Sequence, residues 1–413
     1  MNAVSDVQFR DRLRRNISRT LAFGFFQVFL VIMPVVVPFF ESRGLTMQQI
    51  FLLQALFAVV VLVMEIPSGY AADILGRRVT LLVGSVFIGL GHSMLLFADG
   101  FGGLALFEMF LGIGSSLVSG TDLAILYDSE AALGHDAGRR QELVGRLFTM
   151  HTASEALGGV VCSVLLIWTL DAAVYVQVVV GWIPLLIALN LVEPPGERMD
   201  ANNHLANMRE IFEHLMNSGA VLRLTFLALS IWSLTTFYAV WLLQKLWQQQ
   251  GVELSQFGYL WAIYMLVSAG AGRLALKAED RFGATALLAF VGVLPALGYA
   301  GLALFGTVGG FVAALTFFVA RGLGLVVLRD AFNKRLPGRF RATANSLASF
   351  GFRAAFAATG PFVGWTLDLW GMEATLALLA IVSLVIFATL LLPLTLAVRS
   401  AAATVVEPAV GGG

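Results

Sequence analysis

Residues 65–78 read EIPSGYAADILGRR, and they separate two long apolar stretches at residues 47–70 and 78–98. A short polar turn between two apolar segments of about 20 residues is the pattern of two membrane-spanning helices. The two arginines that end the turn are typical of a loop on the cytoplasmic side. This stretch therefore predicts a helical membrane protein in which the turn at residues 65–78 lies on the cytoplasmic side.

The composition supports the same class. The chain has 413 residues, of which 58% are hydrophobic and 13% are charged, and its mean hydropathy is +0.84. Soluble domains carry about 25% charged residues, so the composition excludes a water-soluble globule. The 26 basic and 26 acidic residues balance, whereas a nucleic-acid-binding protein needs a basic excess. A single cysteine, Cys162, excludes a disulfide framework and a cysteine-based metal site, and we expect neither a metal nor a cofactor.

Twelve apolar segments are long enough to cross a bilayer. The short alternating strands of a membrane barrel are missing from the pattern, so we predict an all-α membrane protein with twelve transmembrane helices. The predicted spans are residues 18–40, 47–70, 78–98, 103–128, 146–168, 173–193, 221–245, 254–276, 284–305, 308–330, 342–368 and 372–397.

Basic residues indicate the orientation of these helices. Arginines crowd residues 10–19, before the first span, and most other basic residues outside the spans fall on that same side of the predicted membrane. The opposite side receives Arg43 and Lys245. Under the positive-inside rule, both termini are expected in the cytoplasm, with the chain in the lipid bilayer of a bacterial inner membrane.

The longest polar stretch divides the spans into two sets of six. We expect residues 1–193 and 221–413 to form two six-helix bundles, with residues 194–220 as a cytoplasmic linker. Apolar residues recur at helical spacing from Leu205 to Leu215. That spacing predicts either an amphipathic helix on the membrane face or a solvated helical linker.

The turn quoted above has a counterpart in the second half of the chain. The Asp-x-x-Gly spacing of Asp73 and Gly76 recurs, half a chain later, at Asp280 and Gly283. Such an internal repeat is expected of transporters built from two related halves. The pattern Gly-x-x-x-Asp-x-x-Gly-Arg-Arg of residues 69–78, with its 6+6 arrangement of spans, resembles the major facilitator superfamily over the whole chain.

This resemblance implies two six-helix bundles around a central cavity, transport by alternating access, and a monomer. It also implies a cytoplasmic gate formed by Glu65, Gly69, Asp73, Gly76, Arg77, Arg78 and Asp280. Two departures weaken any assignment to drug–proton antiport. Glu108 stands where many proton-coupled members carry an arginine, and the glycines after Glu155 lack the proline of the antiporter signature.

Ionisable residues inside the predicted spans are the strongest functional candidates, because a charge in the bilayer is costly unless it is paired or hydrated. Inside the spans, acidic residues occur in the first half of the chain and basic residues in the second half. These residues are Glu65, Glu108, Asp122, Glu155, Arg321 and Arg353. We expect them to face a central chamber that water can reach.

The fourth predicted helix carries two of these acids. Glu108, Gly112, Ser115, Ser119 and Asp122 follow at intervals of four, three, four and three residues, which places them on one helical face. A helix–helix packing seam would explain the glycine and the serines, but it leaves the two carboxylates unexplained. The spacing therefore favours a polar pathway.

Two uses of the buried charges compete. In the first, Asp122, Glu155 or Glu108 carries protons, while Arg321 and Arg353 hold an anionic solute or act as counter-ions. In the second, Glu155 pairs permanently with an arginine as a structural bridge. Further candidates to contact a solute are Gln27, Ser119, Trp232 and Tyr238.

The sequence contains no phosphate-binding loop, zinc-protease motif or nucleophile elbow, so we predict neither an ATP-driven pump nor an enzyme. The leading interpretation is proton-coupled efflux of a small amphiphilic compound, because the interior is aromatic and bears carboxylates. One alternative is a proton symporter that imports an organic anion or a carrier-bound nutrient. Another is a transporter-like receptor or lipid-handling protein without proton coupling.

Overall fold

Most of the part that the structure describes is helical, and that part contains no strand. The structure is a computed structural model, and it describes the backbone of residues 3–135, 137–195, 204–337 and 340–406. Contacts divide the chain into two compact units. Unit 1 comprises Met1–Asn202 and Val252–Ile263, and unit 2 comprises Asn203–Gly251 and Tyr264–Gly413. The boundaries predicted at residues 193 and 220 stay predictions, because this division follows contacts and not independent folding.

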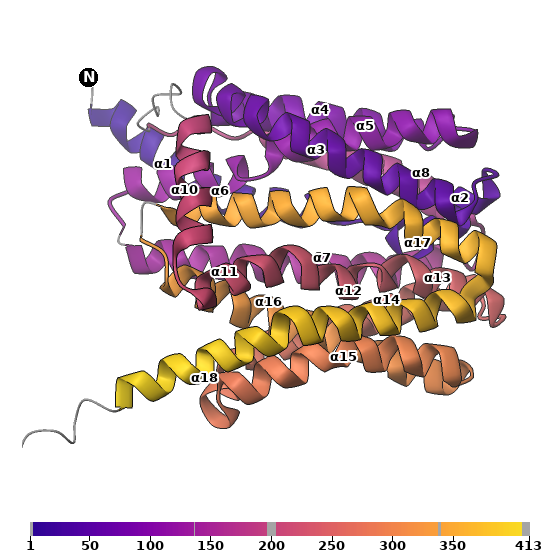
Figure 1. Ribbon diagram of the computed structural model, residues 1–413. Coiled ribbons are helices and arrows are strands. Elements are labelled where there is room, and N and C mark those ends of the chain that lie inside the picture. Colours follow the sequence, from indigo (N-terminus) through magenta and orange to yellow (C-terminus); the bar gives the residue numbers. More distant parts are fainter. Residues whose placement is uncertain (1–2, 136, 196–203, 338–339, 407–413) are drawn as a thin grey trace, which may run out of the picture. The chain divides into compact units, whose positions relative to one another are not determined.

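Unit 1 contains the helices of the first half of the chain (Figure 1). They are α1 (Ala3–Gln27), the 3-10 turn η1 (Met33–Val35), α2 (Val36–Ser42), α3 (Met47–Leu75), α4 (Arg77–Met94), α5 (Gly100–Val118), α6 (Thr121–Ala132), α7 (Ala137–Leu165), α8 (Leu170–Gly181) and α9 (Ile183–Leu189). The beginning of α14 (Leu254–Phe282) also belongs to this unit.

Unit 2 contains the rest of α14 and the helices of the second half. They are α10 (His204–Asn217), α11 (Ala220–Leu227), the π-helical turn η3 (Ala228–Trp232), α12 (Ser233–Phe237), α13 (Ala239–Gln249), α15 (Ala284–Leu304), α16 (Thr307–Lys334), α17 (Arg341–Ile386), the π-helical turn η5 (Phe387–Leu391) and α18 (Leu392–Val406). A kink at Gly371, whose φ is +80°, divides α17 between the last two predicted spans.

Eight described helical stretches are long and apolar enough to cross a membrane. They are Met47–Glu65, Gly100–Ala132, Leu170–Leu189, Ala220–Gln249, Leu254–Phe282, Ala284–Leu304, Thr307–Lys334 and Thr343–Ser400. The last of them contains two predicted spans, since it continues through the kink. Helices α1 with α2, α4 and α7 occupy the remaining predicted spans, so the prediction of an all-α membrane protein is confirmed.

The first predicted span is not one helix. Helix α1 ends at Gln27, and the backbone stays irregular until η1 begins at Met33. The break leaves backbone groups that need partners inside the unit. Gln177 of α8 supplies one: its Oε1 accepts a hydrogen bond from the Ile32 N–H at 3.3 Å, and its Nε2 lies 3.2 Å from Nε2 of His92.

The fourth predicted span is also broken, which corrects the expectation of one continuous polar face. Helix α5 ends at Val118 and α6 begins at Thr121. Gly120, between them, has a φ of +81°, a conformation that favours glycine. The regular spacing from Glu108 to Asp122 therefore does not define a single helical face, because the break changes the direction of the residues after it.

Helix α10 forms where the linker was predicted to be helical, and its apolar face is partly buried in unit 2, whereas Phe212 is exposed. Ile211 and Leu215 are buried in the core of unit 2, and α10 lies across the ends of α11 and α17, with which it is in contact (Figure 1). The side chains of Leu205 and Met208 lie outside the described residues. The two alternatives for this segment, an amphipathic helix on the membrane face and a solvated helical linker, both stay predictions.

Glycines allow helices α4 and α5 of unit 1 to pack closely. A Cβ on Gly114 of α5 would lie 2.6 Å from the Ile88 side chain and 2.8 Å from the backbone oxygen of Gly84, both on α4. Small residues at such crossings let membrane helices approach closely.

This contact gives the first testable prediction. We expect Gly114→Ala to lower the free energy of unfolding by about 1–3 kcal/mol, because the methyl group overpacks the crossing. Thermal unfolding of the purified protein in detergent measures the effect. Gly102→Ala is the control, since a Cβ at Gly102 meets nothing within 4 Å; equal melting temperatures for the two variants would contradict the tight crossing.

Candidate functional site

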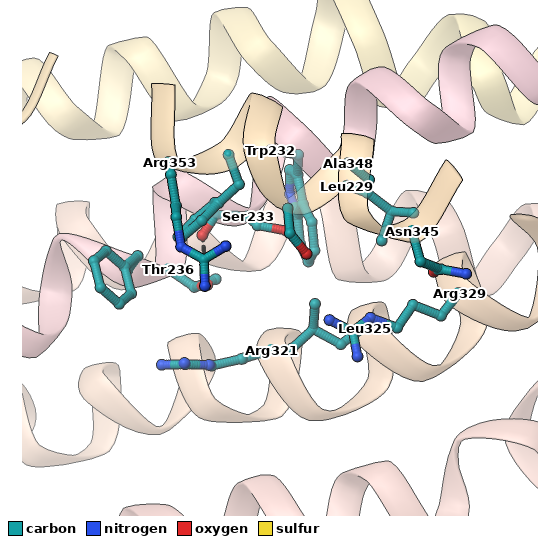
Figure 2. A pocket seen from close by; sticks show the side chains of 13 residues that line it. Leu229, Trp232, Ser233, Thr236, Arg321, Leu325, Arg329, Asn345, Ala348 and Arg353 are labelled. Carbon is teal, nitrogen blue, oxygen red and sulfur yellow. Dashed lines mark hydrogen bonds between the residues drawn. The ribbon is translucent and has the colours of Figure 1, made fainter. Parts of the chain in front are cut away.

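Three arginines line a cavity of about 240 Å³ inside unit 2 (Figure 2). Its walls come from η3 with α12, from α16 and from α17. The lining residues are Leu229, Trp232, Ser233, Thr236, Phe237, Arg321, Leu325, Arg329, Asn345, Ala348, Ser349, Phe352 and Arg353. We call this cavity the arginine pocket. It brings together three of the predicted solute contacts, Arg321, Arg353 and Trp232.

Helical spacing places the basic residues of α16 in the pocket. Arg321, Leu325 and Arg329 are four residues apart, and residues at this spacing share a helical face. Figure 2 shows the two arginines on the same side of α16 with Leu325 between them. Arg321 is half-buried, whereas Arg329 is exposed.

Helix α17 forms the facing wall with the same spacing. Asn345, Ser349 and Arg353 are four residues apart and all line the pocket. The Asn345 side-chain amide donates a hydrogen bond to Oδ1 of Asn333 on α16 at 2.7 Å. This bond joins the two walls at one end of the pocket.

Phe237 of α12 connects the same walls at the other end. The Arg321 guanidinium lies 5.9 Å from the centre of the Phe237 ring, within the range of a cation–π contact. Phe352 of α17 meets the same ring edge-on, with 5.3 Å between ring centres. Because Phe352 precedes Arg353, both arginines of this end lie close to one aromatic cluster.

The third wall contains the π-helical turn η3 (Ala228–Trp232). Ser230 Oγ donates toward the carbonyl oxygen of Ala348 at 3.3 Å, which attaches the turn to α17. Gly324 of α16 leaves room for the Trp232 indole, with which a Cβ at this position would clash. Turns of this kind interrupt the regular helix and occur frequently at functional sites.

Two polar atoms in this wall have no hydrogen-bond partner among the described residues. They are Nε1 of Trp232 and Oγ of Ser233, and the Trp232 side chain is only 1% exposed. A buried polar group without a partner is destabilising by about 1–3 kcal/mol, so its presence calls for an explanation. A bound solute with acceptor atoms would satisfy both groups.

The charged side chains that line the pocket are all arginines. None of the described residues that line it is acidic, and an arginine keeps its proton even where it is buried. Guanidinium groups bind carboxylates and phosphates through two parallel hydrogen bonds. With Trp232, Phe237 and Phe352 in its walls, the pocket has the chemistry of a site for an organic anion.

Sequence reasoning missed Arg329 and Asn345 of this pocket. Arg329 lies close to the end of its predicted span, where a basic residue was interpreted as a sign of orientation. The signal that would have found it is its distance of two helical turns from Arg321. Asn345 carries no charge and lies near the beginning of a predicted span, so no pattern marked it.

Tyr238, another predicted solute contact, does not line the pocket. Its side chain is 5% exposed, its hydroxyl lies 2.5 Å from Oγ1 of Thr359, and its ring stacks on Phe356. These contacts make it part of the packing between α12, α13 and α17.

The predicted proton carriers lie in unit 1 and are not gathered into one cluster by the contacts described. Glu108 is 3% exposed and accepts a hydrogen bond from the Gln54 amide at 2.5 Å. Asp122 is 6% exposed and accepts from the Leu123 N–H at 2.8 Å. Ser119 is exposed at the break between α5 and α6. Both acids are thus buried, and each has a hydrogen-bond donor.

Glu155 lies on α7 where this helix meets the end of α1. The hydroxyl of its neighbour Ser154 donates to the Phe25 carbonyl at 2.5 Å, and Gly158, one turn further, packs against the backbone of Leu30. Gln27 is the last residue of α1. Glu155, which is half-buried, therefore belongs to the part of α7 that flanks the break in the first span.

The predicted gate motif forms a polar cluster at the α3–α4 turn. Gly76 has a φ of +90° and separates the two helices. Arg77 forms an ion pair with Asp128 of α6, with 2.7 Å between Nε and Oδ2. Arg78 donates to the Leu189 carbonyl at 3.0 Å. The motif thus joins the ends of four helices of unit 1.

Glu193, which the sequence did not mark, completes this cluster. Its two carboxylate oxygens accept hydrogen bonds from the N–H groups of Arg77 and Arg78, at 2.8 and 2.7 Å. These are free N–H groups at the first turn of α4, where a negative charge is favourable. Glycine is favoured at position 76 because its φ of +90° is one that other residues rarely adopt.

The remaining gate candidates take no described part in the cluster. The Glu65 carbonyl accepts a hydrogen bond from Ser68 Oγ at 3.0 Å, and a Cβ at Gly69 would meet nothing within 4 Å. Asp280 is exposed on α14, in unit 2. The side chain of Asp73 lies outside the described residues. The gate role of these residues stays a prediction.

Comparisons with known proteins agree with this architecture. A sequence model described as Major Facilitator Superfamily matches residues 17–333. A search of curated proteins finds no match. Among solved structures, a mutant of the nucleoside transporter NupG is similar with a TM-score of 0.77 and 14% identity, covering 94% of this chain and 99% of that one.

Two further structures illustrate the range of similar proteins. A POT family transporter in complex with 5-aminolevulinic acid has a TM-score of 0.71 and 14% identity, with 95% and 97% of the two chains covered. A D-xylose–proton symporter has a TM-score of 0.67 and 16% identity, with 94% and 99% covered. At these identities the likeness concerns the fold alone.

The cap on α4 yields the second prediction. We expect Glu193→Gln to lower the free energy of unfolding by about 1–2 kcal/mol, because it removes the negative charge and one of two acceptor oxygens at the helix N-terminus. Thermal unfolding in detergent measures the loss. Glu142→Gln on α7 is the matched control, since Glu142 is 60% exposed in its pair with Arg146; a loss of the same size there would refute the cap.

Proposed function

Because this chain belongs to the major facilitator superfamily, we propose that it is a proton-coupled symporter of a small organic anion, which binds in the arginine pocket. Membership makes the chain an integral membrane transporter rather than an enzyme. The observation that carries the proposal is the pocket itself, which has three arginines and no acid among its described lining residues. Guanidinium groups bind carboxylates and phosphates through parallel hydrogen bonds, so three of them around one cavity favour an anionic solute.

The lining residues suggest how the anion is held. Arg321 and Arg353 offer the two parallel hydrogen bonds that suit a carboxylate or a phosphate. Trp232 and Ser233 add neutral donors, whose atoms have no other partner among the described residues. Phe237 supports the Arg321 guanidinium and offers an apolar surface to the rest of the solute.

Proton coupling follows from the cost of moving an anion. Against a membrane potential of 100 mV, each elementary charge costs about 2.3 kcal/mol, and a cotransported proton offsets that cost. The buried carboxylates of Glu108 and Asp122, together with the half-buried Glu155, are groups that can take up and release such a proton. We place both termini in the cytoplasm, supported by the exposed arginines at the beginning of α1, with the monomer as the working unit.

The pocket favours anion symport over the efflux of an amphiphilic compound, because a cluster of cations repels the cationic amphiphiles that carboxylates would attract. Efflux stays a prediction from the sequence. Transport assays that load either side of the vesicle distinguish the two directions, and a receptor would show no flux under any gradient.

The third prediction tests the pocket. In purified protein we expect Arg321→Gln and Arg353→Gln each to weaken the binding of organic carboxylates about tenfold or more, because hydrogen bonds to charged groups contribute about 1.5–3 kcal/mol. Isothermal titration or ligand-dependent thermal shifts measure the affinity. Arg399→Gln removes an exposed arginine of α18 that does not line the pocket and should leave it unchanged. Unchanged affinity in both pocket variants would overturn the proposal.

The fourth prediction tests coupling. In proteoliposomes with an inward proton gradient, we expect Asp122→Asn or Glu155→Gln to abolish the accumulation of the anion, because an amide side chain does not titrate. Exchange of labelled for unlabelled solute, which needs no net proton movement, should persist. Glu142→Gln serves as the control, and a gradient-driven uptake that survives in both variants would exclude these two carboxylates as carriers.

A further inference from the structure

The arginines of the pocket occupy two levels. Arg321 and Arg353 lie at the level of the Phe237–Phe352 ring pair. Asn345, two turns before Arg353 on α17, bonds to Asn333 at the far end of the pocket. Helices α16 and α17 are therefore antiparallel along the pocket.

Arg329 belongs to the far level. It lies one turn before Asn333 on α16 and eight residues after Arg321, so the two arginines are about 12 Å apart along the helix axis. Figure 2 shows both side chains extending in the same direction along α16, so this separation is kept between their guanidinium groups. The pocket thus has a cationic group at each of two levels.

The wall between these levels is mixed, because it contains the hydroxyl side chains of Ser233, Thr236 and Ser349 beside apolar residues. Leu325 lies between the two arginines of α16, and Leu229 and Ala348 face it from η3 and α17. The neutral donors of Trp232 and Ser233 lie on the same η3–α12 wall. A small monoanion would meet the charge of one level only. An elongated solute would meet both, and its middle would contact the wall between them.

We infer that the arginine pocket takes an elongated dianion, with an acidic group at each end. The inference rests on the proposed function and names its substrate class. Arg321 and Arg353 hold one acidic group, and Arg329 holds the other. Arg329 is thereby a specificity-determining residue, which distinguishes a two-ended solute from a one-ended solute of the same length.

The experiment compares unbranched α,ω-dicarboxylates of increasing length with monocarboxylates of the same carbon number. Binding to the purified full-length protein in detergent is measured by isothermal titration. In the wild type we expect dicarboxylates to bind more tightly than matched monocarboxylates, with an optimum where the two carboxylates lie about 12 Å apart in the extended chain.

Substitution of Arg329 is the decisive part of this binding experiment. We expect Arg329→Gln to weaken the optimal dicarboxylate about tenfold and to leave the matched monocarboxylate unchanged, which also shows that the variant is folded. Arg329→Lys should restore part of the preference, because it returns the charge. Arg353→Gln should weaken both ligands.

The outcomes separate this inference from the proposed function. Equal affinity for the two series in the wild type, or an equal effect of Arg329→Gln on both, would overturn the dianion and leave the anion transporter intact. If no carboxylate of either series binds at any length, the proposed function falls together with the inference.

Discussion

The permanent positive charge of arginine is the constraint on which the site in unit 2 depends. Arginine keeps its proton in any surroundings that a protein offers, and a membrane span is a poor place for a cation. Arg321 and Arg353 lie well inside predicted spans, and Arg329 lies nearer the end of one. All three line the cavity between α12, α16 and α17. The cavity and the charge of the arginines that line it therefore have to be explained together.

Departures from regular helix recur where the two units carry polar groups. In unit 1 the breaks after Gln27 and at Gly120 lie beside predicted proton carriers. In unit 2 the π-helical turn η3 brings Trp232 to the pocket. Side chains satisfy backbone groups near two of these departures: Gln177 accepts from the Ile32 N–H, and the Tyr299 hydroxyl donates to the Thr235 carbonyl, just after η3, at 2.7 Å. Irregular backbone inside a membrane protein is tolerated where the protein itself provides such partners.

Much of the fold could be predicted from the sequence, because a bilayer imposes a length and a hydrophobicity on every span. Arg321, Arg353 and Trp232 could also be identified, since charge and aromatic character stand out in an apolar segment. The break at Gly120 could not, because a glycine within an apolar run fits a continuous helix equally well. Arg329 was hidden by the positive-inside pattern, which already explained a base near the end of a span. Glu193 escaped because its partners are 115 and 116 residues away in the sequence, and a local pattern contains no such information.

The same long separation has a consequence for biosynthesis. The first turn of α4 receives its carboxylate from a residue made 115 residues after Arg78. At elongation rates of about 5–20 residues per second, this part of the nascent chain waits for about 6–23 seconds before its partner leaves the ribosome. During that interval the α3–α4 hairpin must stay in the membrane with the start of α4 solvated by water or lipid headgroups. The cap on α4 therefore forms only after α9 has been made, and a ribosome stalled before Glu193 would leave the α3–α4 hairpin without this cap.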